Sequence, residues 1–286
     1  MRFTRLVFCS FGVALAGGPH IAKGSDLQEA LTLYASFDEG TDATFSAGDA
    51  ALYTLVNPRE KLLEKGLPKG GGTARLEESG RLGGCLDFQD ADADWILYQA
   101  EKNLAYTSED WQGTVSLWLR CDPVDGLAPG YCDPIQITPR QWNDAAFFVD
   151  FNKEGSPRDF RLGAFSDLSL WNPEDKEVPE SERPLVVSEN PGFSPDKWTH
   201  VAFTWEGYNN GDTEAVTRLY IDGKPNGVLK DWNQRFTWGD QEQSALMLGL
   251  HYIGQLDELA CFNRALSAAE VLSLYAEPEA LAGGVK

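Results

Sequence analysis

Hydrophobic and polar residues alternate in short runs along most of this chain. The runs are rich in aromatic and β-branched side chains and end at glycine, proline, asparagine or aspartate. Because alternate residues of a strand point to opposite faces, this pattern predicts the strands of a sandwich or barrel. The predicted strands cover residues 31–37, 113–120, 145–151, 160–165, 198–205, 216–221 and 258–263.

Two local signals add a turn and a helix to these strands. Asp222-Gly223 lies between two strand-like runs and favours a tight hairpin turn. Near the end of the chain, Ser267 precedes Glu270 by three residues and apolar residues follow, which is the pattern of a capping box. We expect a short amphipathic helix there, ended by Pro278.

The strand pattern predicts a single domain over residues 30–278. Two long segments, residues 57–84 and 171–197, interrupt the pattern, and the second is acidic and rich in proline. Such a composition is typical of a solvated surface loop. Neither segment reads as a linker, because the strands on both sides follow the same pattern.

The first 16 residues have the organisation of a secretory signal peptide. Arg2 and Arg5 precede an apolar run from Leu6 to Ala16, which ends in an A-x-A-like cleavage pattern. The run is too short to span a bilayer, which needs about 20 residues. We therefore expect a protein that is secreted, periplasmic or on the extracellular surface, with no membrane insertion.

The charge of the chain excludes some partners. The formal net charge is -20, and removal of the two arginines of residues 1–16 makes it -22. Such a surface repels phosphate backbones, so we expect no nucleic-acid partner, and anionic lipid surfaces are disfavoured too. The acidity is compatible with calcium, whose ligands are oxygens, although charge that keeps the protein soluble is the simpler explanation.

Cysteine usage agrees with export. Without Cys9 the chain retains four cysteines, and an even number in an exported chain predicts two disulfides. One predicted bond joins Cys121 to Cys132 and closes a loop of about a dozen residues. Three pairings of four cysteines are possible.

Five segments together resemble those of a known protein family: SFDEG (36–40), GRLGGCLDFQDADADWILY (80–98), DKWTHVAFTWEG (196–207), RLYIDGKPNG (218–227) and GQLDELACFNRALSAAEV (254–271). They resemble, in the same order, the conserved pieces of laminin G-like domains of the concanavalin A-like lectin/glucanase type. The resemblance implies an all-β jelly-roll of two antiparallel sheets with adjacent first and last strands and one short C-terminal helix. It does not settle the function, because this fold hosts lectins, adhesion modules, lyases and glycanases.

The resemblance also implies two details. It places the strands of Cys85 and Cys261 near each other, which predicts the second disulfide. It further implies a structural calcium ion where the closing strand meets the first strand, held by Asp257 and by Asp38 or its neighbouring backbone. The alternative is that Asp257 forms turn hydrogen bonds without a metal.

No catalytic motif is present. A glycosidase needs two carboxyl groups flanking one sugar bond, and no apolar strand carries them at the spacing Glu-x-Asp-x-(x)-Glu. No G-x-S-x-G turn occurs either. We predict no catalytic residue.

Strand alternation points to one candidate binding face. It places Trp118, Arg120, Asp150 and His200 on the outward sides of their strands. An aromatic ring with charged donors and acceptors suits a sugar. Two alternatives remain open: a loop such as 171–197 covers this sheet, and His200 is a structural hydrogen-bonding residue.

The resulting interpretation is a secreted, non-catalytic carbohydrate- or glycoprotein-binding protein, stabilised by calcium, of unknown oligomeric state. The alternatives are a polysaccharide-degrading lyase or hydrolase and a cell-surface adhesion or structural module with a protein ligand. The first interpretation requires an exposed Trp118 and a buried Trp205. If Trp118 is buried, the ligand must lie at rim loops near Trp142, Trp171 or Trp232, and the adhesion module becomes the first interpretation.

Overall fold

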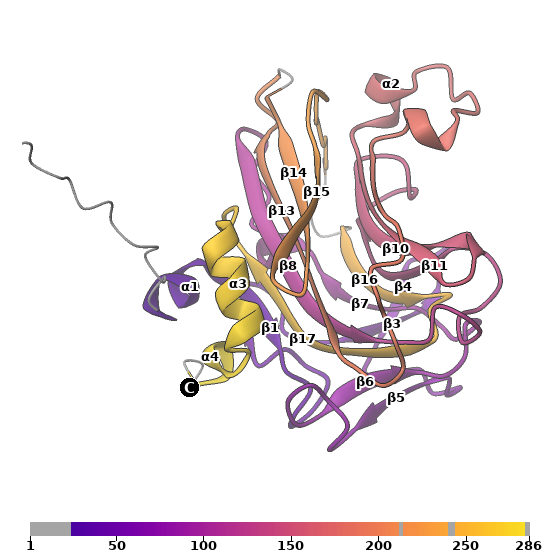
Figure 1. The fold of residues 1–286 in the computed structure, drawn as a ribbon, viewed down its shortest axis with the longest axis vertical. Coiled ribbons are helices and arrows are strands. Elements are labelled where there is room, and N and C mark those ends of the chain that lie inside the picture. Colours follow the sequence, from indigo (N-terminus) through magenta and orange to yellow (C-terminus); the bar gives the residue numbers. More distant parts are fainter. Residues whose placement is uncertain (1–23, 212–213, 240–243, 284–286) are drawn as a thin grey trace, which may run out of the picture.

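The computed structural model describes residues 24–211, 214–239 and 244–283. Within these residues two antiparallel β-sheets pack face to face (Figure 1). The predicted all-β, two-sheet fold is therefore confirmed. The expected signal peptide, residues 1–16, lies outside the described residues. None of the helices described is long and apolar enough to cross a membrane.

Sheet A contains the first and last strands of the described chain. These two strands, β1 and β17, pair antiparallel, as the jelly-roll topology requires. In spatial order, sheet A consists of β15 (Lys224–Leu229), β14 (Val216–Ile221), β13 (Thr199–Tyr208), β8 (Trp111–Arg120), β17 (Gly254–Phe262), β1 (Leu31–Ala35) and β2 (Phe45–Ser46), with β6 (Cys85–Phe88) paired to β17 and β5 (Thr73–Leu76) paired to β6.

Sheet B faces sheet A across the core. In spatial order it consists of β12 (Leu185–Ser188), β11 (Arg158–Phe165), β10 (Ala146–Gly155), β9 (Cys132–Thr138), β16 (Ala245–Leu250), β7 (Ile96–Gln99), β3 (Tyr53–Asn57) and β4 (Leu62–Lys65). Residues 57–84 and 171–197, which were expected to be loops, thus contain strands β4, β5 and β12. Each has four residues, and two residues per face are too few for alternation to show in the sequence.

The core lies between the sheets and follows the predicted alternation. Val115, Leu117 and Leu119 of β8 point inward, and so do Phe147 and Val149 of β10. All five are fully buried in one cluster. The alternation therefore assigns the inward and outward sides of these strands correctly.

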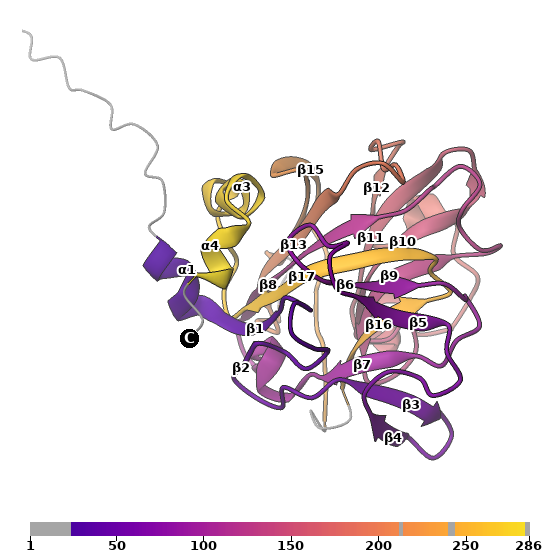
Figure 2. The same cartoon turned by 90° about the horizontal axis from the view of Figure 1, so that it is seen from below.

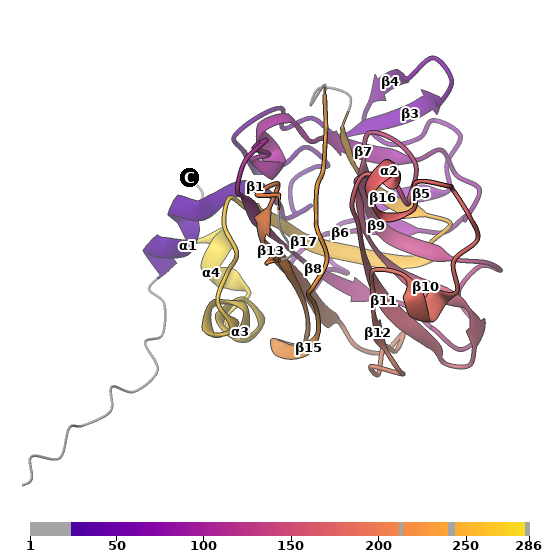
Figure 3. The same cartoon turned by 90° about the horizontal axis from the view of Figure 1, so that it is seen from above.

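The C-terminal helix α3 (Ala268–Ala276) begins at the predicted capping box. The Ser267 hydroxyl accepts a hydrogen bond from the Glu270 backbone N–H, and the Glu270 carboxylate accepts one from the Ser267 backbone N–H. Together with α1 (Gly24–Ala30) and α4 (Glu279–Ala282), α3 lies beside sheet A (Figures 1 and 2). The remaining helices are α2 (Leu168–Trp171), on the side of sheet B (Figure 3), and the 3₁₀ turns η1 (Glu101–Leu104) and η2 (Glu180–Glu182).

The predicted disulfide between Cys85 and Cys261 is wrong, because both are free thiols. Their strands β6 and β17 do pair, with Leu86 opposite Leu256. Cys261 lies five residues beyond Leu256, where it is opposite Val115 of β8. At about 3.4 Å per residue this separation exceeds the Cα–Cα distance that a disulfide spans.

The predicted disulfide between Cys121 and Cys132 is also wrong, since both are free thiols. Cys121 follows β8 of sheet A, whereas Cys132 begins β9 of sheet B. Each thiol has another partner: Cys121 is hydrogen-bonded to the Tyr252 side chain, and Cys132 donates to the Ala128 carbonyl at 3.3 Å.

We expect the chain without Cys9 to release four reactive thiols in denaturant and almost none when folded. All four are buried, and burial raises the pKa of Cys85 and Cys121 to about 12 and that of Cys132 to about 11. The thiolate is the reactive species, so native thiols react slowly. Titration with Ellman's reagent, with and without guanidinium, measures both values. Two thiols or fewer in unreduced, unfolded protein would restore a disulfide.

Candidate functional site

The outer face of sheet A is closed by side chains from other elements. Trp118 is only 4% exposed, because its ring stacks on Tyr275 of α3 at 5.7 Å and Arg81 lies 4.7 Å from its centre. The predicted exposure of Trp118 is therefore wrong. Trp205 is 1% exposed, as predicted.

His200 and Arg120 are also engaged by neighbouring residues. His200 is fully buried beside Trp118, and its Nε2 lies 2.9 Å from the Ser116 hydroxyl. Arg120 hydrogen-bonds Gln255 and lies over the Trp198 ring at 4.8 Å. These contacts fit the structural alternative for His200.

Asp150 lies on a different sheet from the other three predicted ligand-binding residues. It belongs to β10 of sheet B, whereas Trp118, Arg120 and His200 belong to β8 and β13 of sheet A. All four do point outward, but the outer faces of two stacked sheets face opposite directions. The predicted four-residue site therefore does not form, and only Asp150 remains at a cavity.

That cavity is a groove of about 990 Å³ on the outer face of sheet B. Its floor crosses the strands in register: Phe148 of β10 is opposite Gln136 of β9, which is opposite Met247 of β16, which is opposite Leu97 of β7. Gly163 of β11 leaves room for the Phe148 ring, because a Cβ there would lie 2.2 Å from that ring. The floor thus changes from polar to apolar between β9 and β16.

The charged part of the groove is built around Arg161 of β11. Its guanidinium binds both carboxylate oxygens of Asp150, and it pairs with Glu180 at 3.0 Å. The Tyr131 ring lies over it at 4.6 Å. Burial and the charge of Asp150 raise the pKa of nearby Asp133 well above its usual range. A protonated Asp133 can donate as well as accept a hydrogen bond.

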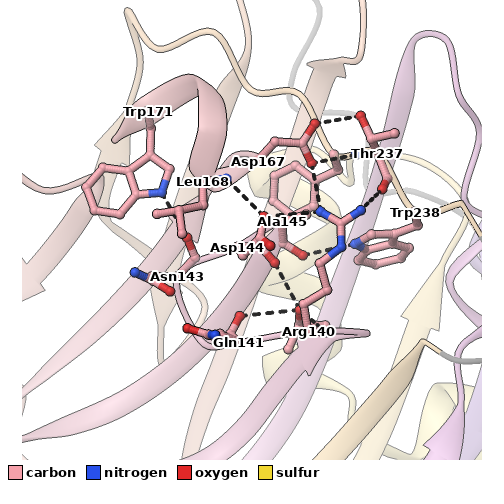
Figure 4. Close-up of polar contacts among 12 residues, drawn as sticks. Arg140, Gln141, Asn143, Asp144, Ala145, Asp167, Leu168, Trp171, Thr237 and Trp238 are labelled. Atoms are coloured by element: carbon pink, nitrogen blue, oxygen red, sulfur yellow. Dashed lines mark hydrogen bonds and ion pairs between the residues drawn. The ribbon is translucent and has the colours of Figure 1, made fainter. Parts of the chain in front are cut away.

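The hairpin between β9 and β10 forms one end of the groove, and polar contacts hold it in place (Figure 4). Arg140 binds Asp144 within the hairpin and Asp167 and the Thr237 carbonyl outside it. The Asp144 carboxylate also accepts the Leu168 backbone N–H at 2.9 Å. These bonds tie the hairpin to α2 and to the segment at residue 237.

Two tryptophans of the same two elements, Trp171 of α2 and Trp238 beside residue 237, also hold this hairpin. The indole of Trp171 donates to the Asn143 carbonyl at 2.8 Å, and the indole of Trp238 donates to the Ala145 carbonyl at 2.9 Å (Figure 4). The hairpin is thus fixed on both sides of Trp142.

Trp142, at the centre of this fastened hairpin, is 43% exposed and lines the groove. Its ring packs edge-to-face on Phe148 and Phe165. The sequence analysis named Trp142 and Trp171 only as rim residues for the case of a buried Trp118. No local pattern separates an exposed tryptophan from a hydrogen-bonding one, because the difference depends on contacts with residues 143 and 165.

The predicted calcium ligands Asp38 and Asp257 both bind the segment before β6. The Asp257 carboxylate accepts the backbone N–H groups of Arg81 at 2.6 Å and Leu82 at 3.1 Å, and that of Glu258 at 2.8 Å. Asp38 similarly accepts a backbone N–H from residue 84 at 2.8 Å. Burial raises the pKa of Asp257 to about 7.

A guanidinium already occupies the backbone oxygens that were expected to bind calcium. Arg75 of β5 donates to the carbonyls of Phe37 and Asp38. The described residues include no group of three or more His, Cys, Asp and Glu side chains that could hold a metal ion. Calcium needs six to eight oxygen ligands, so this junction fits the metal-free alternative better. Calcium binding itself stays a prediction.

A comparison with known families agrees with this architecture. Residues 99–272, more than half of the chain, match the laminin G-type family described as the concanavalin A-like lectin/glucanases superfamily. The chain belongs to this superfamily. The resemblance found in the sequence is therefore confirmed, and the matched segment includes β9, β10, β11 and β16 of the groove. No curated protein matches the chain.

Several solved structures share the concanavalin A-like fold with this chain. Domain 4 of AbnA, a GH43 extracellular arabinanase from Geobacillus stearothermophilus, solved in complex with arabinotriose, has a TM-score of 0.53 at 18% identity and covers 86% of this chain and 98% of its own. The receptor binding domain of botulinum neurotoxin C/D mosaic serotype has a TM-score of 0.56 at 12% identity and covers 87% of this chain. The binding domain of Paraclostridial Mosquitocidal Protein 1 has a TM-score of 0.53 at 14% identity and also covers 87%. This chain spans about half of the two toxin domains, 51% and 52%.

Burial of His200 predicts a specific loss of stability in acid. Burial lowers the pKa of His200 from 6.5 to about 4. Below pH 6.5 the unfolded chain therefore binds a proton that the folded chain does not, and stability falls as the pH approaches 4. The contribution amounts to about 3 kcal/mol. Urea unfolding at pH 7 and pH 4 measures the loss in the free energy of unfolding. His200→Gln should lose about 3 kcal/mol less than the unmodified protein between these two pH values.

The matched control for this experiment is His251→Gln. His251 is exposed, so this variant should lose as much stability in acid as the unmodified protein does. Equal pH dependence of all three proteins would contradict a buried, neutral His200.

Proposed function

We propose that this protein is a non-catalytic carbohydrate-binding protein whose binding site is the groove on sheet B. The observation that carries the proposal is the exposed Trp142 ring on a hairpin fixed by Arg140, Trp171 and Trp238. Sugar rings bind proteins by stacking on an aromatic face while nearby polar groups bind their hydroxyls. A fixed ring loses little entropy when it binds.

The polar half of the groove supplies the groups that hydroxyls need. Gln136 offers both a donor and an acceptor, and the carboxyl group of Asp133 offers acceptor oxygens. Outside this half, Ser244, the residue before β16, lines the same groove with a buried hydroxyl that has no hydrogen-bond partner. A glycan or the glycan of a glycoprotein would satisfy these groups. The arabinotriose bound to the arabinanase domain is consistent with this use of the fold.

The same groove argues for binding rather than catalysis. Asp150 is held at both oxygens by Arg161 and is buried. A carboxylate held in this way is poorly placed to act as the nucleophile or base of a glycosidase, which needs two carboxyl groups at the sugar bond. Asp133 is then left without a second free carboxylate. The lyase or hydrolase alternative receives no support from this arrangement.

Burial of Trp118 removes the first site predicted from the sequence, and rim loops with a protein ligand were the next choice. The groove on sheet B favours the carbohydrate-binding interpretation over the adhesion module, because it joins the rim residue Trp142 to a sheet floor that contains Asp150. We therefore keep the glycan as the ligand. We also propose export, on the basis of the apolar run 6–16.

We expect Trp142→Ala to weaken glycan binding by about fivefold or more, because loss of a central aromatic contact costs over 1 kcal/mol. Trp142→Phe should retain part of the affinity. The matched control is Leu170→Ala, since Leu170 is also 41% exposed, lies on the adjacent α2 and does not line the groove. A glycan array followed by calorimetry with the best glycan measures all four proteins.

Three results would contradict the proposal. No binding to any glycan would favour a protein ligand, and unchanged binding by Trp142→Ala would move the site away from the groove. Release of reducing ends or unsaturated products from polysaccharides would instead identify an enzyme.

Calcium is left out of the proposed function, because Arg75 and backbone N–H groups already engage the expected oxygens of residues 37, 38 and 257. We expect millimolar calcium or a chelator to leave the melting temperature unchanged, since only a ligand of the folded state shifts it. Arg75→Ala should lower the melting temperature in either condition. A rise with calcium that Asp257→Ala abolishes would establish the calcium site predicted from the sequence.

A further inference from the structure

One half of the groove is apolar and open. Leu97, Met247 and Leu250 form a hydrophobic cluster on the outer face of sheet B, flanked by half-buried residues. These flanking residues are Tyr53, Leu55, Leu63, Trp95 and Ala245. All members come from the strands of sheet B and their adjoining loops, whereas the cluster on the outer face of sheet A includes side chains of α1, α3 and α4.

This apolar half is continuous with the polar half. In the register across the sheet, Gln136 of β9 is directly opposite Met247 of β16, and Leu97 of β7 follows. Both halves line the same cavity. A ligand that fills it therefore meets mainly polar groups on β9 and β10, apart from Phe148, and mainly hydrocarbon on β16, β7, β3 and β4, apart from Gln99.

The groove is large enough for more than one sugar ring. Its volume of about 990 Å³ lies at the upper end of the range for ligand sites. A single ring over Gln136 and beside Trp142 would leave the half-buried Leu55, Leu63 and Trp95 in contact with water. Covering apolar surface of this kind is favourable at about 25 cal/mol per Å². A second sugar would place hydroxyls there instead.

We propose that the ligand of this groove is a glycan that carries an acyl or alkyl chain. The sugar lies over the polar half, and the chain lies along the apolar half between Leu55, Leu63, Leu97 and Met247. This inference rests on the proposed function and deepens it by naming the chemical class of the ligand. The source is a soluble, acyl-substituted glycan rather than a membrane, because the net charge of -20 opposes an anionic lipid surface.

The test uses n-alkyl β-D-glucosides with chains of six to nine carbons as probes, each below its micelle concentration. We expect the dissociation constant to fall by roughly threefold to fourfold for each added methylene, the increment of a buried CH₂. Calorimetry with the full chain measures the series. A dissociation constant that does not change with chain length would overturn the inference.

A pair of variants locates the chain. Leu55 and Leu63 face each other on β3 and β4, are half-buried and line the groove, so Leu55→Gln with Leu63→Gln should flatten the dependence on chain length without unfolding the protein. The matched control is Leu62→Gln, because Leu62 is the next residue on β4, is 50% exposed and does not line the groove. The proposed position would be contradicted if the dissociation constant of the double variant still fell with chain length as in the unmodified protein. It would also be contradicted if the dissociation constant of the control no longer depended on chain length.

Trp142→Ala separates this inference from the proposed function. It should weaken every member of the series by the same factor and leave the dependence on chain length intact. Dissociation constants that depend on chain length but are unchanged by Trp142→Ala would reject the carbohydrate site and keep the apolar one. Weaker binding by Trp142→Ala with no dependence on chain length would do the reverse. The protein should not sediment with phosphatidylcholine vesicles that contain a glycolipid. Co-sedimentation would overturn the inference that the ligand is a soluble glycan.

Discussion

Each sheet of this sandwich buries one face against the other, and its outer face must then be covered or meet water. On sheet A the cover is α3, which places Tyr275 over Trp118 and His200. Val271 and Leu274 pack the helix on Ala260 and Phe262 of sheet A. The capping box of Ser267 and Glu270 and the ion pair between Glu270 and Arg264 fix where it begins. Closure of this face makes sheet A a structural layer, which is why we propose the groove on sheet B as the binding site.

Strand alternation predicted the direction of side chains but not the sheet to which each strand belongs. Trp118 and Asp150 both point outward, as predicted, yet they lie on opposite sides of the molecule. Membership of a sheet is decided by pairing between distant segments, such as β8 with β13 and β17. The alternation of hydrophobic and polar residues within one strand does not show to which sheet that strand belongs. The fold was therefore predictable from ordered motifs, whereas the candidate site required the topology.

Other failures of the sequence analysis have the same origin in long-range contacts. Arg75 reaches the carbonyls of Phe37 and Asp38 from a four-residue strand that alternation did not reveal. Cys85 and Cys261 lie on paired strands, but the register along β17 separates them. A family resemblance gives the neighbours of a strand correctly. It does not give the register, and a disulfide or a metal site depends on the register.

The hairpin that carries Trp142 explains how an exposed aromatic ring can be both fixed and available. Arg140 and Asp144 bind partners beyond the hairpin, and the indoles of Trp171 and Trp238 bind its carbonyls, so the backbone is held while the Trp142 ring is left partly open. The entropy of ordering this loop is lost when the protein folds rather than when a ligand binds. The bond between Trp238 and Ala145 belongs to the core between the sheets, whereas Arg140, Asp144 and Trp171 are not members of that core cluster. The hairpin that presents Trp142 is therefore anchored to the core at one end of its contacts and to α2 at the other.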